Sequence, residues 1–413
     1  MWINLIKEFL QDMRKQKLRT TLTIMAITWG TFAVVALLSF GEGLGIKLLE
    51  GARGGGDQVM IFYSGQTSKP YEGLDIGRRV RFTEEDVALV RRSVPQVKHV
   101  SAQYGRSVGL RSEFGTTNTY MEGVDTGFDV MRSMITRSGG RFINNRDIEE
   151  NRRVVYIGYE IARQLFPDSN PVGQQMFIDH NPFTVIGVME EKMQMGMSNG
   201  PDSRRAIIPY TTYQQMYSQR YLGSILIRPH QPEYQEEVNA RFRELMARKY
   251  KFHADDTQAI QVWDFIESER IFTQVNLGIK MFLSIVGLFT LLIAGVGVAN
   301  IIYVVVKERT REIGVKKAIG ARNAHIISQF VFESVFICLL GGLLGLSIAA
   351  GLIFGVKALP LDGDVATFLG NPVLAPDIMF MTTFILSIIG CVAGIFPAMK
   401  ASKVDPVESL RYE

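Results

Sequence analysis

Four long apolar runs, each without a charged side chain, constrain this 413-residue chain more than any other feature. They cover residues 20–41, 281–306, 334–356 and 378–399. A helix needs roughly 20 apolar residues to cross about 30 Å of hydrocarbon. None of the runs has the polar face that a helix at the surface of a soluble protein would show at 3.6-residue spacing. The sequence therefore predicts an integral membrane protein with four transmembrane helices.

Lysine and arginine residues beside the runs predict the orientation, because such residues are retained on the cytoplasmic side. Residues 1–19 carry five of them, residues 307–322 carry six, and residues 400–413 carry three. The segment 357–377 instead holds three aspartates and one lysine. We therefore expect both termini and residues 307–322 in the cytoplasm, and residues 43–272 on the outer side.

The predicted fold class is an α-helical membrane protein with four transmembrane helices. A large α+β extracytoplasmic domain of two lobes is inserted between helices 1 and 2. At the N-terminus, Trp2, Ile6 and Phe9 share one helical face opposite charged residues, which is typical of a helix in the membrane interface. The predicted segments are an interfacial helix (1–17), transmembrane helix 1 (18–42), the extracytoplasmic domain (43–272), a stalk with transmembrane helix 2 (273–306), a charged cytoplasmic segment (307–323), transmembrane helix 3 (324–356), a short outer loop (357–377), transmembrane helix 4 (378–399) and a cytoplasmic tail (400–413).

The extracytoplasmic domain shows both strand and helix patterns. Thr83 and Asp86 have the spacing of a capping box at the start of a helix, and Asp179 to Pro182 are expected to turn a hairpin. Residues 101–218 are expected to form a lobe inserted into an inner lobe made of 43–100 and 219–272. Strands are predicted at 57–63, 154–158, 183–189, 206–210, 224–229 and 258–264, and helices at 83–95 and 232–250.

The sequence contains no ATP-binding P-loop, which needs G-x-x-x-x-G-K-[ST] to surround phosphates with backbone amides and one lysine. "GARGGGDQ" (51–58) has Asp57 and Gln58 where the lysine and hydroxyl belong, and "GEGLGIKLL" (41–49) has the wrong spacing. We interpret both as flexible glycine-rich segments at a membrane exit. The chain is therefore expected to bind no nucleotide and to be no enzyme by itself.

Other chemistries also lack a signature. Neither G-x-S-x-G nor H-E-x-x-H occurs, and the five histidines are scattered. The net charge of +4 is too small to suggest a nucleic-acid partner. The two cysteines, Cys338 and Cys391, both fall within apolar runs, so the outer domain has no cysteine ligand for a metal. No catalytic residue, cofactor or metal is expected in this chain.

Methionines cluster in "MEEKMQMGM" (189–197). Thioethers outside the cytoplasm can bind Cu(I), whereas flexible methionines also form adaptable apolar surfaces. We favour the second interpretation, an outer contact loop for a partner or substrate formed by Met193, Met195 and Met197.

Glu333 is the one carboxylate near the third apolar run, about 11 residues beyond Arg322. A buried intramembrane charge usually has a function, so a proton relay is one interpretation. At about 1.5 Å per residue the side chain also lies within reach of the basic cytoplasmic edge, and we favour a structural ion pair. Recurring glycines in runs two and three predict close helix packing, either within one chain or across a dimer seam.

The segment "KERTREIGVKKAIGAR" (307–322) carries six basic and two acidic side chains between two apolar runs. It also holds apolar residues and Gly320, which can stop a helix. A segment that only marked the cytoplasmic side would need neither. We therefore expect a helix and a turn with charges and apolar contacts (Ile313, Val315, Ala318 and Ile319) that a soluble partner can bind.

The same segment with its continuation, "KERTREIGVKKAIGAR…QFVFESV", closely resembles the signature of MacB/FtsX-like permeases, the membrane subunits of one class of ABC transporter. "GRFINNRDIEENRRVVYIGYEIARQLFPDSNPVGQQMFIDHNPFTVIGVM" is similar to the outer domain of that family, and "FPAMKASKVDPVESLRYE" to its C-terminal end. The resemblance extends over nearly the whole chain.

The resemblance implies a bacterial inner-membrane permease that docks on a cytoplasmic ABC ATPase, where ATP and Mg would bind. MacB carries its ATPase at its own N-terminus, whereas this chain begins with the predicted interfacial helix, so the ATPase is expected to be another polypeptide. The permease would form a homodimer, or a heterodimer with a paralogous permease, in contact with membrane lipid. A membrane-fusion adaptor and an outer-membrane channel are possible partners. The implied ATPase-coupling residues are Glu308, Arg309, Arg311, Glu312, Ile313, Gly314, Lys317, Gly320, Ala321 and Arg322.

The leading functional hypothesis is export of an amphipathic substrate, driven by movements of the outer domain. The first alternative is an FtsX-like signalling subunit that controls an extracytoplasmic enzyme or sensor, or transport of the lipoprotein-release type. A plain anchored binding domain without an ATPase is a further alternative, and the charged segment 307–322 argues against it.

Overall fold

The chain forms two compact units, which we describe separately. The membrane unit contains the residues up to Lys47 together with those from Gln274 onward, and the outer unit is Leu48–Thr273. The predicted interfacial helix (1–17) and cytoplasmic tail (400–413) lie almost entirely outside the described residues. The computed structural model describes residues 17–167, 169–197, 199–359 and 370–402.

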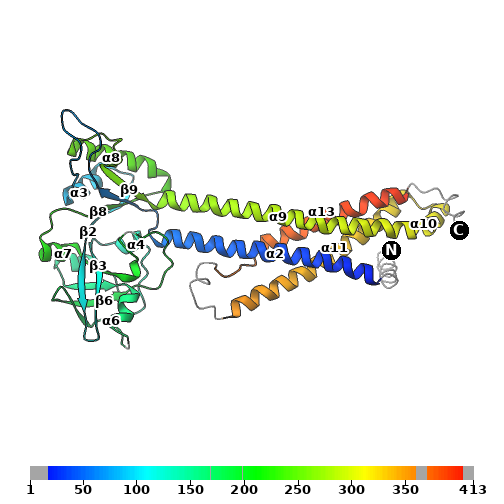
Figure 1. Cartoon of the computed structure of the whole chain (residues 1–413), viewed down its shortest axis with the longest axis horizontal. Helices are drawn as coiled ribbons and strands as arrows, with labels where there is room; N and C mark the ends of the chain where they lie inside the picture. Colours follow the sequence, from blue (N-terminus) through cyan, green and yellow to red (C-terminus); the bar gives the residue numbers. More distant parts are fainter. Residues whose placement is uncertain (1–16, 168, 198, 360–369, 403–413) are drawn as a thin grey trace. The chain divides into compact units, whose positions relative to one another are not determined.

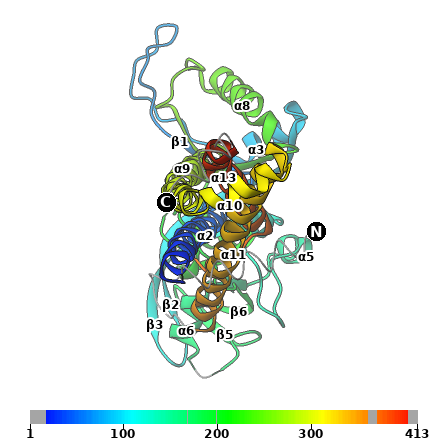
Figure 2. The same cartoon turned by 90° about the vertical axis from the view of Figure 1, so that its right-hand side faces the viewer.

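The membrane unit confirms the four predicted transmembrane helices, counted over the described residues. They are α2 (Lys17–Gly54), α9 (Phe265–Glu308), α11 (Asn323–Ala358) and α13 (Pro376–Ser402). Figures 1 and 2 show them side by side as a bundle. Helix α2 ends and helix α9 begins in the outer unit, so these two helices are the chain connections between the units.

Small residues let the helices of the bundle approach closely. A Cβ atom at Gly341 of α11 would lie 2.8 Å from Cβ of Ile27 on α2, and one at Gly390 of α13 would lie 3.2 Å from Sγ of Cys338. At these positions the close packing expected of small residues in lipid takes place within the chain. A Cβ atom at Gly297 of α9 would meet no atom within 4 Å.

The prediction of flexible glycine-rich segments at 41–49 and 51–58 is wrong for most of their length, because α2 continues to Gly54. Glycine lowers helix propensity by about 1 kcal/mol, but here it permits close contacts within the membrane unit. A Cβ atom at Gly43 would overlap the carbonyl oxygen of Asn371, and one at Gly45 would overlap the side chain of Asn276. Gly43 and Gly45 therefore serve close packing within the membrane unit.

The outer unit contains both helices and strands, as the sequence predicts, and its strands form one mixed sheet. The strand order is β3-β7-β4-β6-β5-β2-β8-β1-β9, with a further pairing between β2 and β3. The pairs β3–β7 and β4–β6 are parallel, and the other pairs are antiparallel. The strands are β1 (Met60–Ser64), β2 (Val97–Arg111), β3 (Thr116–Val124), β4 (Val154–Ile157), β5 (Gln175–Ile178), β6 (Asn181–Val188), β7 (Arg205–Pro209), β8 (Ser224–Pro229) and β9 (Ile260–Asp264).

Local sequence signals place several elements as expected. The backbone N–H of Thr83 donates to Asp86 at 2.7 Å, which forms the capping box of α3. Asp179 and His180 have φ angles of 44° and 71°, as a two-residue hairpin turn between β5 and β6 requires. The helices of the outer unit are α3 (Glu84–Ser93), α4 (Phe128–Met131), α5 (Asn145–Glu149), α6 (Tyr159–Leu165), α7 (Tyr210–Tyr217) and α8 (Gln235–Tyr250), with 3₁₀ turns η1 (Asp202–Arg204) and η2 (Pro232–Tyr234).

The two lobes share the sheet. Figure 1 shows α3 and α8 on the lobe with β8 and β9, between which β1 lies, and α6 and α7 on the other lobe. Strand β2 pairs with β8 over its first half and with β3 over its second half, so the predicted boundary at residue 100 falls within β2. The larger apolar core likewise joins Phe62 and Phe242 of the inner lobe to Val155 and Phe183 of the inserted lobe.

Candidate coupling site

A short helix, α10 (Thr310–Ala318), follows α9 directly in the membrane unit. Its end has the hydrogen bonds of a Schellman motif: Gly320 N–H donates to the Lys317 carbonyl and Ala321 N–H to the Lys316 carbonyl, both at 3.0 Å. Gly320 has a φ angle of 97°, which a residue with a Cβ rarely adopts. Gly320 therefore stops the helix as predicted, and α11 begins at Asn323.

One face of α10 is anchored to the helix bundle. Ile313 is 4% exposed and belongs to an apolar cluster with residues of α9, α11 and α13. Gly314 is buried as well. Lys317 Nζ donates to the Ser402 carbonyl at the end of α13, at 2.7 Å, and Lys316 Nζ to Gln329 of α11 at 3.3 Å. Ile313 and Gly314, two of the expected coupling residues, are thus buried in the membrane unit.

Glu333 forms the ion pair that the sequence favours. Arg309 Nη1 lies 3.3 Å from Glu333 Oε1, and the two side chains are 15% and 6% exposed. Gln329 Nε2 donates to the same oxygen at 3.4 Å. The pair ties the residue that precedes α10 to α11, on which Glu333 lies.

The opposite face of α10 is exposed and combines both charge signs with apolar side chains. Arg311 and Val315 lie one helical turn apart on this face, and the exposed Ile319 and Arg322 follow in the turn after the helix. Val315 is 45% exposed and Ile319 is 81% exposed. Exposed apolar side chains rimmed by charges are typical of a protein interaction surface. We call the exposed set the α10 stripe; it comprises Glu308, Arg311, Glu312, Val315, Ala318, Ile319 and Arg322.

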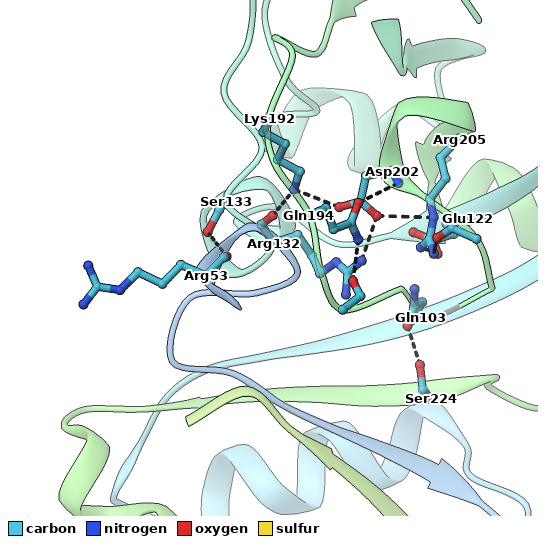
Figure 3. Close-up of polar contacts among 12 residues, drawn as sticks. Arg53, Gln103, Glu122, Arg132, Ser133, Lys192, Gln194, Asp202, Arg205 and Ser224 are labelled. Carbon is cyan, nitrogen blue, oxygen red and sulfur yellow. Dashed lines mark hydrogen bonds and ion pairs between the residues drawn. The ribbon is translucent and has the colours of Figure 1, made fainter. Parts of the chain in front are cut away.

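A second group of charged residues lies inside the outer unit and was not predicted (Figure 3). Asp202 lies at its centre and forms ion pairs with Arg132 at 2.7 Å, Lys192 at 2.8 Å and Arg205 at 3.3 Å. Arg205 also pairs with Glu122. We call these five residues the Asp202 cluster. Asp202 and Arg205 are three residues apart, but Glu122, Arg132 and Lys192 come from other segments and the set follows no motif, so only the fold brings the five together.

The Asp202 cluster holds three cationic and two anionic side chains, and burial shapes their ionisation. Burial raises the pKa of Glu122 above its usual value, although the arginines act against this rise. Burial also lowers the pKa of Lys192. Burial alone would raise the pKa of Asp202, but the charges of Arg132, Lys192 and Arg205 outweigh it and hold that pKa well below its usual range. Asp202 is therefore an ionised carboxylate that three cations share.

The three methionines of the expected contact loop differ in their exposure and contacts. Met193 is 9% exposed, and Met195 N–H donates to the Gly51 carbonyl of α2 at 3.0 Å, within the outer unit. Met197 is 49% exposed and borders an open hollow of about 570 Å³ beside Trp263 of β9. Within the described parts of the chain, no group of three or more histidine, cysteine or acidic residues could hold a metal ion.

Comparison with known proteins covers nearly the whole chain. A family model described as the MacB-like periplasmic core domain matches residues 20–245, and one described as the FtsX-like permease C-terminal matches residues 284–406.

Two relatives have similar sequences along the full chain. A "Macrolide export ATP-binding/permease protein MacB" from Chlorobium luteolum is 30% identical, over 100% of this chain and 60% of the relative. An "Uncharacterized ABC transporter permease YknZ" from Bacillus subtilis is 27% identical, over 99% of this chain and 98% of the relative. The chain thus spans about three fifths of the length of the MacB relatives it matches. Among solved structures, the extracellular domain of YknZ from Gram-positive bacteria is similar at a TM-score of 0.41 and 19% identity, over 50% of this chain and 100% of that domain.

Proposed function

The chain belongs to the family of ABC transporter permeases that join a MacB-like periplasmic core domain to an FtsX-like permease region, and on this premise we propose that it couples ATP hydrolysis by a separate cytoplasmic ATPase to movements of its outer unit. The permease works in the bacterial inner membrane with both termini in the cytoplasm. The lysine and arginine residues beside the spans support this orientation. The likeness to the Bacillus subtilis relative, whose name denotes a permease alone, supports a separate ATPase.

The α10 stripe carries this proposal. Its charged and apolar side chains are exposed, while Ile313, the Arg309–Glu333 pair and the Lys317–Ser402 hydrogen bond fix the other side of the helix to the bundle. A docking helix needs both properties, since a partner must bind it and its displacement must reach the transmembrane helices. The ATPase therefore binds the stripe and pulls or pushes α9, α11 and α13 through these anchors.

The outer unit responds because α2 and α9 connect it to the membrane unit. The relatives named macrolide export proteins favour export of an amphipathic substrate over a signalling role. The functional permease is a dimer, in which each copy docks one ATPase subunit.

Replacing Glu308, Arg311 and Glu312 together with alanine tests the coupling site. We expect the variant to insert into the membrane at the native level but to lose co-purification with the ATPase and stimulation of its hydrolysis, each by at least tenfold. The matched control replaces Arg241, Glu244 and Arg248, exposed charges on α8 of the outer unit, and should keep both properties. Native co-purification and native stimulation in the first variant would refute the assignment.

The purified complex also tests export. Amphipathic compounds are screened for stimulated ATP hydrolysis, and a stimulating compound should be transported in vesicles by the native permease but not by the triple variant. An FtsX-like signalling role predicts instead that hydrolysis responds to an extracytoplasmic protein and to none of the compounds.

A further inference from the structure

We propose that the Asp202 cluster is the joint through which movements of the end of α2 and the start of α9 reach the inserted lobe, with Lys192 as its positioning residue. The inference rests on the proposed function, because it concerns how the outer unit receives a movement. All the contacts that carry it lie within the outer unit.

Two segments that contain members of the Asp202 cluster contact the end of α2. They are the methionine-rich segment (189–197) and the segment that follows α4 (132–134). Met195 N–H donates to the Gly51 carbonyl at 3.0 Å, and a Cβ atom at Gly54 would overlap the carbonyl oxygen of Met193. On the other side, the Ser133 hydroxyl donates to the Arg53 carbonyl at 3.0 Å. The segment after α2 continues this contact, since Asp57 N–H donates to the Met131 carbonyl at 3.0 Å.

The start of α9 meets the same two segments. A Cβ atom at Gly196 would lie 2.7 Å from the ring of Phe265, the first residue of α9. The Arg132 guanidinium lies 5.9 Å from the centroid of that ring. An ion pair of 2.5 Å between Arg53 and Glu269 also ties α9 to α2. Both helix ends are therefore held to the segment that follows α4 and to the methionine-rich segment.

The cluster links these two segments to each other and to the sheet (Figure 3). Lys192 Nζ donates to the Arg132 carbonyl at 2.6 Å and to Asp202 at 2.8 Å, so it joins the methionine-rich segment to α4 and η1. Asp202 N–H also donates to Gln194 at 2.9 Å. From Asp202 the ion pairs continue through Arg205 of β7 to Glu122 of β3.

Charge and burial make this link stiff. Asp202, Glu122, Arg132 and Arg205 are at most 1% exposed, and charges in the low-dielectric interior interact more strongly than charges in water. Apolar surfaces can slide past one another at small cost, whereas separating a buried ion from its partner is strongly unfavourable. A displacement of either helix end is therefore passed to β7 and β3, which lie in the inserted lobe.

The substitution Lys192→Met tests the joint in the full chain without nucleotide. It removes two hydrogen bonds but leaves Arg132 and Arg205 to neutralise Asp202 and Glu122, so the sheet should stay folded. We expect hydrogen–deuterium exchange at least tenfold faster than native in three separate segments, residues 51–57, 128–134 and 192–196, with β1 unchanged.

The matched control is Arg163→Met, which breaks an exposed ion pair of 3.0 Å with Glu191 on the same segment. It should change exchange less than twofold. If Lys192→Met accelerates exchange only within residues 192–196, or leaves all three segments at the native rate, the joint is refuted.

A second comparison adds the ATPase and nucleotide. In the native complex, nucleotide should change exchange both at residues 51–57 and in β7. Lys192→Met should keep the first change and lose the second, which a residue with a merely structural role would not do, and Arg163→Met should keep both. Retention of the β7 change in Lys192→Met overturns the inference. If nucleotide changes nothing in the native outer unit, the proposed function fails, while the nucleotide-free comparison still decides for or against the joint.

Discussion

Replacing Glu333 with glutamine should loosen α10 while leaving the transmembrane bundle assembled. Removing one partner of a buried ion pair costs about 3–5 kcal/mol. The 3.3 Å separation from Arg309 is longer than the ~2.7–2.9 Å of a strong charge-assisted hydrogen bond, and glutamine keeps an acceptor oxygen. We therefore expect a loss of about 1–3 kcal/mol in the local free energy of opening of α10, which corresponds to about 5- to 150-fold in an equilibrium constant.

Hydrogen–deuterium exchange of the full chain in lipid nanodiscs measures this loss directly. The amides of Ile313 in α10, which donates to Arg309, and of Ile319 just after it, which donates to Val315, should exchange 5- to 150-fold faster than native. Glu312→Gln is the matched control, because an exposed substitution on the same helix stays within about ±0.5 kcal/mol, or roughly twofold. Native exchange of α10 in Glu333→Gln would show that the pair does not hold this helix.

Three further substitutions test other parts of the account. Gly320→Ala places a residue with a Cβ at a φ angle of 97°, which costs about 1–3 kcal/mol. The affinity for the ATPase, measured in a pull-down titration, should therefore fall about 5- to 150-fold. Native affinity would contradict the role of this helix end. Gly43→Val should lower the thermal unfolding temperature, since overpacking costs about 1–3 kcal/mol, whereas Gly351→Val, where a Cβ would meet no atom within 4 Å, should leave it unchanged; equal effects would refute the packing role of Gly43. Asp202→Asn should destabilise the outer unit by about 3–5 kcal/mol at pH 7. Because the pKa of Asp202 is depressed in the folded state, its contribution to stability is complete above the unfolded pKa of about 4 and is lost as the pH falls toward the folded pKa. The difference in unfolding temperature between the variant and the native chain should therefore narrow below about pH 4. A constant difference would contradict the ionised state.

The sequence predicts those parts of the fold that follow from local patterns. Apolar length alone identifies the four transmembrane helices, and the spacing of Thr83 and Asp86 identifies the start of α3. The turn at Asp179 and the helix stop at Gly320 are also local, because each depends on the backbone conformation of one or two residues.

Features that depend on distant partners could not be predicted. The glycines at 43 and 45 suggest flexibility until Asn371 and Asn276 are seen to pack against them. Strand β2 shows no boundary signal at residue 100, because its two halves differ only in which strands they meet. The Asp202 cluster draws its members from residues 122 to 205, and each of them alone resembles an ordinary surface charge.

The account depends on α10 and the outer unit lying on opposite sides of the membrane, so that an ATPase on one side can act on a domain on the other. Single cysteines at Arg322, beside α10, and at Gln164, on α6, test this in a chain whose native Cys338 and Cys391 are replaced with alanine. A membrane-impermeant maleimide added to intact cells, with outer-membrane access provided where one is present, should label the cysteine at 164 at once and the cysteine at 322 only after the inner membrane is opened. Labelling of both positions before that step would contradict the account.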